Sequence, residues 1–293
     1  MKKRIAIVGI ASGWGAPDQR TANGAHVVIN HLKRHYPDLL YTYASYHLPE
    51  PLPSTAVKPL QDHAIRQFHV TRVVTELSHH IETLVNLGYF PIVIGGDHSI
   101  AIGTWSGIKR AYNTDFSLLW FDAHMDAHTY ETTTSLSPHG MPIAALLGQG
   151  IKAWIDLAYK NHPVMAPEHV YQFGIRSFEA GEASLLAKNN VSIYDTKTCA
   201  KIGLQPILQS VMQTLRTEKF GVSIDIDAFD PIFAPGTGTT EPDGLNPNDI
   251  LSFLTEIKDN PHYVALELME FNPDKDIDDK TLHWIIKFIE TLI

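Results

Sequence analysis

Cysteine is nearly absent from this sequence of 293 residues, in which Cys199 is the only one. A single thiol cannot form a disulfide within the chain, so nothing indicates an oxidising compartment. Apolar runs are also short, since none approaches the roughly 18 residues that a membrane helix requires. The run near the start, Ile5 to Ile10, soon reaches Ser12 and predicts a β-strand rather than a signal peptide. We therefore expect a cytoplasmic protein without a membrane partner.

Long runs of lysine and arginine are missing as well, and the formal net charge is -9. Nucleic acids and anionic membranes bind basic patches, so the sequence argues against these partners, whereas a small cationic substrate suits the acidic balance. The residues Gly9, Gly13 and Gly15 do not form the GxGxxG pattern of a dinucleotide site. No Gly-Lys-Ser or Gly-Lys-Thr is present either, which disfavours a nucleotide-binding protein.

The balance of 44% hydrophobic and 19% charged residues is typical of a globular chain. Eight short runs rich in apolar and β-branched residues predict strands, and longer segments with helical apolar spacing separate most of them. The predicted strands are 4–10, 38–43, 90–94, 116–121, 169–175, 191–194, 219–226 and 262–268. The predicted helices are 64–87, 98–111, 141–158, 180–189, 198–216, 247–258 and 280–292. This alternation predicts an α/β fold with a parallel sheet.

No internal repeat or charge block divides the chain, so we interpret 1–293 as a single domain. The proline-rich stretch 49–59 is short enough for a surface loop. The loops 123–140 and 231–245 each follow a predicted strand directly, and open parallel sheets bind ligands beyond the carboxyl ends of their strands. We therefore expect the functional site in these two loops.

Three segments place candidate metal ligands at the ends of predicted strands. The candidates are His98, Asp122, His124, Asp126, Asp225 and Asp227. The first of them follows Gly95 and Gly96, which would let the backbone turn sharply. Strand side chains flip at every residue, so Asp225 and Asp227 would share one face of the strand 219–226. The sequence therefore predicts that these side chains converge.

Carboxylates this close repel one another and would take up protons unless a cation neutralised them. Four carboxylates and two imidazoles are enough ligands for two divalent ions. This oxygen-rich set suits Mn²⁺ or a similar octahedral ion, whereas structural zinc sites are typically rich in thiolates. Two ions about 3.5–4 Å apart can lower the pKa of a bridging water toward neutrality and hold it as hydroxide for attack. We therefore predict a hydrolase with two Mn²⁺ ions.

Four motifs resemble those of the ureohydrolase family, which contains the arginases, agmatinases and formiminoglutamases. They are GGDHS at 95–99, DAHMD at 122–126, SIDIDAFDP at 223–231 and MEFNP at 269–273. The resemblance extends over about residues 90 to 275 in order and spacing. It implies a three-layer α/β/α fold with an eight-stranded parallel sheet, and assembly as a homo-oligomer, commonly a trimer or hexamer.

The resemblance also implies roles for individual residues. One manganese would be held by His98, Asp122, Asp126 and Asp225, and the second by Asp122, His124, Asp225 and Asp227. A metal-bridging hydroxide would attack the guanidinium carbon while Asp126 forms a hydrogen bond with it. His139 would relay a proton to the leaving amine, and Glu270 would bind the guanidinium group.

The loop 129–142 resembles the arginase segment that binds the amino acid end of L-arginine, which favours hydrolysis of L-arginine to L-ornithine and urea. The predicted substrate-binding residues are His128, Ser135, Ser137, Glu179 and Thr239. His128 and Ser137 stand where arginases usually have asparagine, although both can donate hydrogen bonds to a carboxylate. The stretch 239–245 contains Glu241 and resembles agmatinases instead. Agmatine or another guanidino compound is therefore the alternative substrate.

Two further hypotheses come from other classes of protein. A two-metal phosphoesterase would also use an Asp-x-His sequence such as 122–124, but its further Gly-Asn-His motif is missing. A catalytically silent metal-binding relative would have lost the proton relay or the guanidinium-binding acid, whereas His139 and Glu270 are both present. Release of urea from a panel of guanidino compounds would separate an enzyme from a silent relative.

Overall fold

One parallel sheet forms the centre of the molecule. The computed structural model describes residues 3–45 and 63–293, so the proline-rich stretch 49–59 lies outside the described residues. The strands are β1 (Arg4–Ala11), β2 (Leu40–Ser45), β3 (Tyr89–Ile94), β4 (Phe116–Phe121), β5 (Val170–Ile175), β6 (Ser192–Asp195), β7 (Lys219–Asp225) and β8 (Tyr263–Met269). All eight predicted strands are confirmed, with boundaries that differ by no more than two residues.

The order of the strands brings distant parts of the sequence together. The order is β2-β1-β3-β8-β7-β4-β5-β6, and every neighbouring pair is parallel. The carboxyl ends of all the strands therefore meet along one edge of the sheet. The last two strands, β7 and β8, lie between β3 and β4 in the middle of the sheet. The loops after β3, β4, β7 and β8 are consequently neighbours at that edge.

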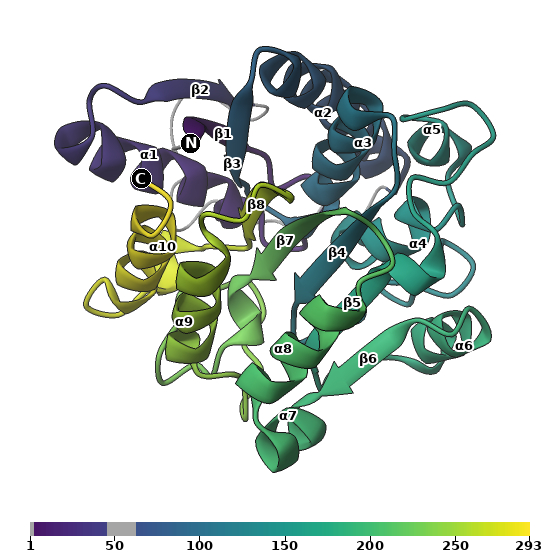
Figure 1. Ribbon diagram of the computed structural model, residues 1–293. Helices are drawn as coiled ribbons and strands as arrows, with labels where there is room; N and C mark the ends of the chain where they lie inside the picture. Colours follow the sequence, from purple (N-terminus) through teal and green to yellow (C-terminus); the bar gives the residue numbers. More distant parts are fainter. Residues whose placement is uncertain (1–2, 46–62) are drawn as a thin grey trace.

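Helices cover both faces of the sheet and complete three layers. They are α1 (Ala22–His35), α2 (His63–Asn86), α3 (Ala101–Tyr112), α4 (Pro142–Leu146), α5 (Lys152–Ile155), α6 (Ala180–Lys188), α7 (Thr196–Ile202), α8 (Leu204–Thr214), α9 (Pro247–Ile257) and α10 (Lys280–Glu290). Helices α1, α8, α9 and α10 pack on one face, and α2, α3 and α4 pack on the other (Figure 1). The predicted α/β/α fold is confirmed.

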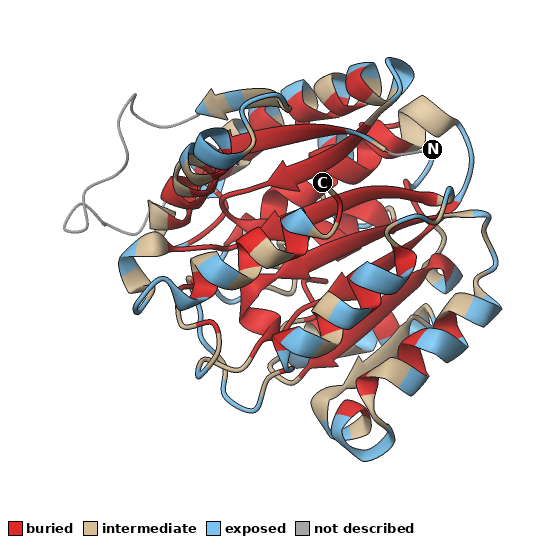
Figure 2. Ribbon diagram, turned by 60° about the vertical axis from the view of Figure 1, so that its left-hand side comes forward, coloured by how far each residue is buried: buried red, intermediate tan, exposed pale blue. Residues whose placement is uncertain are grey.

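Two apolar cores lie between these layers. Ile7 on β1 belongs to the core that includes Val28 of α1, whereas the next residue, Val8, belongs to the core that includes Leu77 of α2. This alternation follows from the two-residue period of a strand. Because both faces are covered, the central strands are buried along nearly their whole length, whereas the outer sides of the helices and many loops are exposed (Figure 2).

Helix α1 was not among the predicted helices. Its first turn contains Asn23 and Gly24, which are weak helix formers. Gly24 is needed because a larger side chain would collide with the backbone of Phe271. The helix is stabilised instead by packing, since Ala25, Val28, Ile29 and Leu32 are buried with helical spacing.

Two predicted helices are interrupted by glycines. The segment 198–216 forms α7 and α8, separated by Gly203 at φ 94°. The segment 141–158 forms only the short helices α4 and α5, and Gly148 and Gly150 between them have φ values of 81° and 92°. Only glycine adopts such angles readily, so Gly203 ends α7, and Gly148 and Gly150 keep α4 and α5 apart. Among the helices that the structure describes, none is both long and apolar enough to cross a membrane.

The burial of isoleucine side chains gives a test of the fold. Ile7 is fully buried, whereas Ile202 is 56% exposed. Ile7→Ala should lower the free energy of unfolding by about 2–5 kcal/mol because it leaves a cavity in the core. Ile202→Ala should change it by less than about 0.5 kcal/mol. Urea denaturation followed by circular dichroism measures both values, and equal effects would contradict the assigned burial.

Candidate metal centre

The predicted ligands meet at the carboxyl edge of the sheet. They follow three strands, β3, β4 and β7, that lie close together in the strand order β3-β8-β7-β4. The ligands are His98 after β3, Asp122, His124 and Asp126 after β4, and Asp225 and Asp227 at the end of β7. Five of the six are buried, and only His124 is partly exposed. The fold therefore concentrates four carboxylates and two imidazoles away from bulk water.

Close packing positions His98 after β3. Neither Gly95 nor Gly96 has a left-handed φ value, so the expected sharp turn is not the reason for these glycines. A side chain at Gly95 would collide with Met269, and one at Gly96 would collide with the backbone of Ser12. The glycines thus let the loops after β1, β3 and β8 approach one another. His98 then begins a short 3-10 turn rather than the predicted helix.

The loop after β4 orients its ligands through hydrogen bonds. Asp122 Oδ1 accepts a bond from the backbone N of His124 at 2.6 Å, and Asp122 Oδ2 accepts one from Trp120 Nε1 at 2.9 Å. The Trp120 ring also stacks on the His98 ring, with 3.9 Å between their centroids. Asp126 has φ 49°, which is strained for a residue other than glycine. The neighbouring structure therefore fixes the direction of these side chains.

Asp225 and Asp227 converge in a way that differs from the prediction. Strand β7 ends at Asp225, and Ile226–Ala228 forms a 3-10 turn, so the two residues do not share a strand face. The turn is closed by Asp225 Oδ1, which accepts a hydrogen bond from the backbone N of Asp227 at 2.8 Å. Asp227 Oδ1 accepts another from the backbone N of Ala123 at 3.1 Å. Both carboxylates still face the ligands after β4.

Two groups of side chains in the described part of the chain could each hold a metal ion. One contains His98, Asp122 and Asp225, and the other contains Asp122, His124 and Asp227. In the first group, His98 Nδ1 lies 3.2 Å from Asp122 Oδ2 and 3.1 Å from Asp225 Oδ2. In the second, His124 Nδ1 lies 3.1 Å from Asp227 Oδ2. Asp122 belongs to both groups, as expected for a bridging ligand.

Asp126 completes the surroundings of the first group. Its Oδ2 lies 3.3 Å from His98 Nδ1. Burial raises the pKa of Asp126 to about 7, and the charge of Asp122 adds to this effect. Burial likewise raises the pKa of Asp225 well above its ordinary value, with further contributions from Asp227 and Asp122. The carboxylates cannot all ionise easily without a positive charge among them.

The two imidazoles supply part of that charge when no metal is bound. Burial alone would lower the pKa of His98, but its contacts with Asp122, Asp126 and Asp225 raise it well above the ordinary value. Burial would raise the pKa of Asp122, but the imidazoles of His124 and His98 lower it. The cluster is thus held together by charge compensation between its own members.

The ring of His98 shows that these residues fit a metal. Its Nδ1 is buried among three carboxylates without a hydrogen-bond partner. Its other nitrogen, Nε2, lies 3.0 Å from Ser223 Oγ, which donates a hydrogen bond to Glu267 Oε2 at 2.8 Å. Metal-binding histidines typically anchor the second ring nitrogen in this manner and leave the first free for the ion. The donor set therefore suits a divalent cation.

A cavity of about 360 Å³ opens beside this cluster. It is lined by His124, Asp126, His128, Ser135, His139, Gly140, Ser177, Phe178, Glu179, Glu182, Asp225, Asp227, Thr239, Glu241 and Glu270. Four of the residues predicted to bind substrate are therefore in the lining, namely His128, Ser135, Glu179 and Thr239. Ser137 is not, because it is buried beneath the loop, where its Oγ accepts a hydrogen bond from Arg66 Nη1 at 2.8 Å.

Glu270 and His139 form a pair in the lining of the cavity. Glu270 Oε1 lies 3.1 Å from His139 Nδ1 and accepts a hydrogen bond from the backbone N of His98 at 3.0 Å. Burial would lower the pKa of His139, but the Glu270 carboxylate raises it. Glu270 itself has φ 64°, a strained value that turns its side chain toward the cavity side of the sheet edge.

Several lining residues were not among the predicted site residues. They are Gly140, Ser177, Phe178, Glu182 and Glu241. The signal for Ser177 and Phe178 was their place directly after the strand 169–175, since loops at carboxyl ends of parallel strands form sites. Glu241 stands in a loop without secondary structure, and its Oε1 lies 3.7 Å from His124 Nε2. The signal for Glu241 was its place in the loop 231–245, which was expected to form part of the site.

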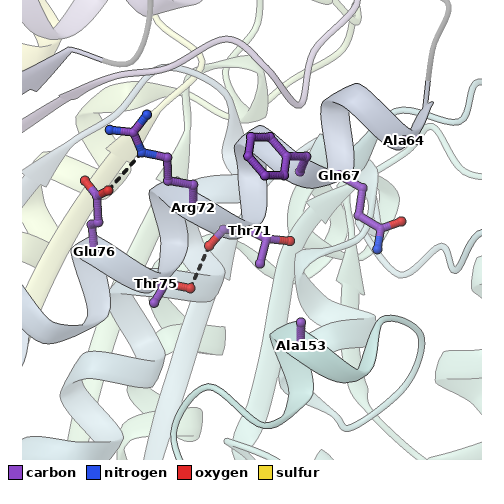
Figure 3. A pocket seen from close by; sticks show the side chains of 8 residues that line it. Ala64, Gln67, Thr71, Arg72, Thr75, Glu76 and Ala153 are labelled. Atoms are coloured by element: carbon purple, nitrogen blue, oxygen red, sulfur yellow. Dashed lines mark hydrogen bonds and ion pairs between the residues drawn. The ribbon is translucent and has the colours of Figure 1, made fainter.

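A second hollow of about 590 Å³ lies on the outer side of α2 (Figure 3). It is lined by Ala64, Gln67, Phe68, Thr71, Arg72, Thr75, Glu76 and Ala153. The part of this lining that the structure describes contains no histidine or aspartate, and Arg72 Nε binds Glu76 Oε1 at 3.0 Å. Size alone therefore does not identify the functional site, whereas the ligand cluster does.

A parallel α/β sheet with buried aspartates and histidines clustered at its carboxyl edge defines a metal-dependent hydrolase. The sequence model of the arginase family matches residues 3–293. The chain belongs to the arginase family and is a metal-dependent ureohydrolase.

Known arginases are similar to this chain over most of its length. The arginase of Bacillus caldovelox is 35% identical over 203 residues, which cover 69% of this chain and 67% of that protein. The arginase of Bacillus subtilis is 28% identical over 296 residues, covering 100% of this chain and 98% of that protein. The crystal structure of arginase from Bacillus cereus has a TM-score of 0.87 at 26% identity, covering 99% and 98% of the two chains.

The shared position of Asp122 leads to a prediction about metal content. Asp122→Asn removes a carboxylate that belongs to both groups, whereas Asp227→Asn affects only the second group. We expect Asp122→Asn to lose both Mn²⁺ ions and Asp227→Asn to lose one. Mass spectrometry of the metal content after gel filtration measures the difference. Equal Mn²⁺ retention by the two variants would contradict a bridging role for Asp122.

Proposed function

We propose that this protein uses two Mn²⁺ ions per chain to hydrolyse L-arginine to L-ornithine and urea. The observation that carries the proposal is the Glu270 carboxylate, which is 4% exposed and faces the same cavity as the ligand cluster. A buried carboxylate beside a metal cluster is suited to bind a planar cation such as guanidinium. Its contacts with His98 and His139 keep it in place.

The proposed ligands divide into two sets. The first ion is held by His98, Asp122, Asp126 and Asp225, and the second by Asp122, His124, Asp225 and Asp227. Four carboxylates and two imidazoles form a hard ligand set, which supports Mn²⁺ rather than a thiolate-bound metal. Two divalent cations, when bound, lower the pKa of water toward neutrality and so supply the nucleophile for hydrolysis of the C–N bond.

Three side chains have proposed roles in the reaction. Glu270 binds the guanidinium group and orients its carbon toward the ligand cluster. Asp126 accepts a hydrogen bond from the attacking water through its carboxylate. His139 delivers a proton from its ring to the leaving nitrogen, so that water adds to the carbon and the amine departs neutral. The distance of 3.1 Å between His139 Nδ1 and Glu270 Oε1 supports this arrangement, because it places the proton donor beside the bound guanidinium.

The charge of the cavity supports a cationic substrate. Two divalent ions would nearly cancel the four ligand carboxylates. Among the described residues, the lining contains four further acids and no lysine or arginine. These acids are Glu179, Glu182, Glu241 and Glu270. The excess negative charge in a partly enclosed space attracts a cation and raises its local concentration.

The lining contains groups for both ends of an amino acid. Ser135 can donate a hydrogen bond to an α-carboxylate, and Glu179 can bind an α-ammonium. The proposed contact of His128 with the carboxylate would replace its present one, because His128 Nε2 lies 3.2 Å from Glu182 Oε2. The similarity of the chain to known arginases supports L-arginine as the substrate.

One observation favours agmatine as a second candidate substrate. Ser137, which was expected to bind the carboxylate, hydrogen-bonds Arg66 away from the cavity, while the rim carries the additional acid Glu241. A site with fewer donors and more acids accepts a diamine-like cation more readily.

Further parts of the proposal concern the whole chain. We propose that 1–293 is one ureohydrolase domain, because the strands form one sheet and one family model spans 3–293. We also propose a trimer or hexamer, as the family resemblance implies, and a cytoplasmic location, as expected from the single cysteine and the short apolar runs. Light scattering on the purified protein measures the assembly.

Urea release tests the proposed reaction. The Mn²⁺-loaded protein would be assayed side by side with L-arginine, agmatine and guanidinobutyrate. We expect urea from L-arginine, with a higher kcat/KM than for the other two compounds. Preferential turnover of agmatine or guanidinobutyrate would contradict the L-arginine assignment but keep the ureohydrolase reaction. No urea from any of them, with both metals bound, would contradict the proposed reaction.

Replacement of Glu270 separates substrate binding from metal binding. Glu270→Gln preserves shape but removes the charge that binds guanidinium, so kcat/KM should fall by about 30-fold or more, since losing one partner of a buried charge pair costs about 2 kcal/mol or more. The Mn²⁺ content should stay at the wild-type level. Glu256→Gln on the exposed side of α9 is the matched control and should change neither value. A fall in Mn²⁺ content for Glu270→Gln would instead assign it to the metal site.

A further inference from the structure

Arg176, directly after β5, connects three loops at the carboxyl edge of the sheet. Its guanidinium donates hydrogen bonds to backbone carbonyls only. The accepting atoms include Asp227 O at 2.7 Å, Pro242 O at 2.8 Å, Glu241 O at 2.9 Å and Gly174 O at 3.0 Å. Its backbone N also donates to Ala123 O at 2.8 Å. One residue, itself on the loop after β5, thus contacts the loop after β4 and two parts of the connection after β7, one at Asp227 and one at Glu241 and Pro242.

We define residues 239–242 as the rim loop, because Thr239 and Glu241 line the cavity. Its neighbours on either side are held by other bonds. Thr237 pairs with Phe271, and Leu245 pairs with Phe229. Between these two attachment points, the guanidinium of Arg176 bonds the rim loop at Glu241 O and Pro242 O.

The side chain of Arg176 is chemically suited to this task. A guanidinium presents five N–H donors in a rigid plane, so it can serve several carbonyls at fixed angles. A lysine ammonium has three donors at one point on a flexible stem and cannot span the same set of acceptors. The geometry therefore requires arginine and not only a positive charge.

We propose that Arg176 is a positioning residue that couples the second metal position to the rim loop. It bonds the backbone of Asp227, a ligand of that position, and the backbone of the rim loop with the same Nη2 atom. If the backbone at Asp227 becomes more rigid, the rim loop therefore becomes more rigid as well, and the reverse also holds. The coupling rests on the proposed function, because it assigns Asp227 to a bound metal. The coupling adds that binding of the second metal ion makes the rim loop more rigid.

Variants of Arg176 test the coupling. Arg176→Lys retains the charge but loses the planar donor set. We expect faster hydrogen–deuterium exchange in the metal-free protein at the reporter amides of the rim loop, Gly244 and Leu245, which follow it closely and donate hydrogen bonds to Asp230 Oδ2 and Ala228 O. The affinity for one of the two Mn²⁺ ions, measured by titration calorimetry, should fall by about 10–100-fold, as for other groups that support metal ligands. Wild-type exchange and wild-type Mn²⁺ affinity in Arg176→Lys would overturn the proposal.

Glu241→Ala is the matched control, because it removes a side chain and keeps the carbonyl that Arg176 binds. Its rim-loop exchange and Mn²⁺ affinity should stay close to the wild-type values, although KM for the guanidino substrate can change. If Glu241→Ala weakened Mn²⁺ binding as much as Arg176→Lys does, the effect would belong to the Glu241 carboxylate beside His124, and the proposed role of Arg176 would be wrong.

A measurement on the wild-type protein keeps the proposal testable if Arg176→Lys fails to fold. Coupling is reciprocal, so Mn²⁺ alone should slow exchange in the rim loop and leave α8, on one face of the sheet, unchanged. An unchanged rim loop would overturn the coupling. The urea assay separates the two ideas: a wild-type protein that releases urea without this protection contradicts the coupling alone, whereas protection without urea contradicts the proposed reaction alone.

Discussion

The mutual repulsion of four buried aspartates is the constraint on which the functional edge of this protein depends. Water cannot screen carboxylates at this depth, so their charge must be balanced by imidazolium groups, by protons or by cations. Without a metal, the raised pKa values of Asp126 and Asp225 and the unpaired Nδ1 of His98 are the cost of this crowding. Cations remove these conflicts together. The edge is therefore complementary to metal ions rather than to its own side chains.

Backbone strain at the carboxyl edge of the sheet also indicates that this edge is built to bind metal ions. Asp126 and Glu270 both have left-handed φ values, and such conformations cost about 1–3 kcal/mol at residues other than glycine. Each is held by bonds to its surroundings: the backbone N of Glu270 donates to Gly96 O, and Asp126 O accepts from the backbone N of Ile143. The sheet and its close-packed loops are rigid enough to impose both conformations. The side chains can then meet although they come from different strands.

The strands and the convergence of acids and histidines at their ends could be predicted from the sequence because their signals are local. Apolar runs mark the strands, and the acids stand directly after them. The predicted strand geometry of Asp227 was wrong, since the chain leaves the strand at Asp225 and a 3-10 turn brings the second carboxylate inward. Helix α1 and the break at Gly203 depend on packing and on φ values that composition does not give. The contacts of Ser137 and Glu241 depend on segments far away in the sequence, so no local pattern reveals them.

The residues proposed to carry the reaction and the residues proposed to select the substrate lie in different parts of this structure. The predicted ligands and Glu270 lie at strand ends, where the sheet fixes them, and in the proposed reaction these groups act on the guanidinium. Groups that face the rest of the substrate come from loops, including 128–140 and the rim loop. A loop can exchange a carboxylate-binding side chain for an acid without disturbing the sheet edge. The turn of Ser137 toward Arg66 and the presence of Glu241 on the rim are changes of this kind. The metal cluster can therefore be kept while the preferred guanidino compound changes, because the two sets of residues have different structural supports.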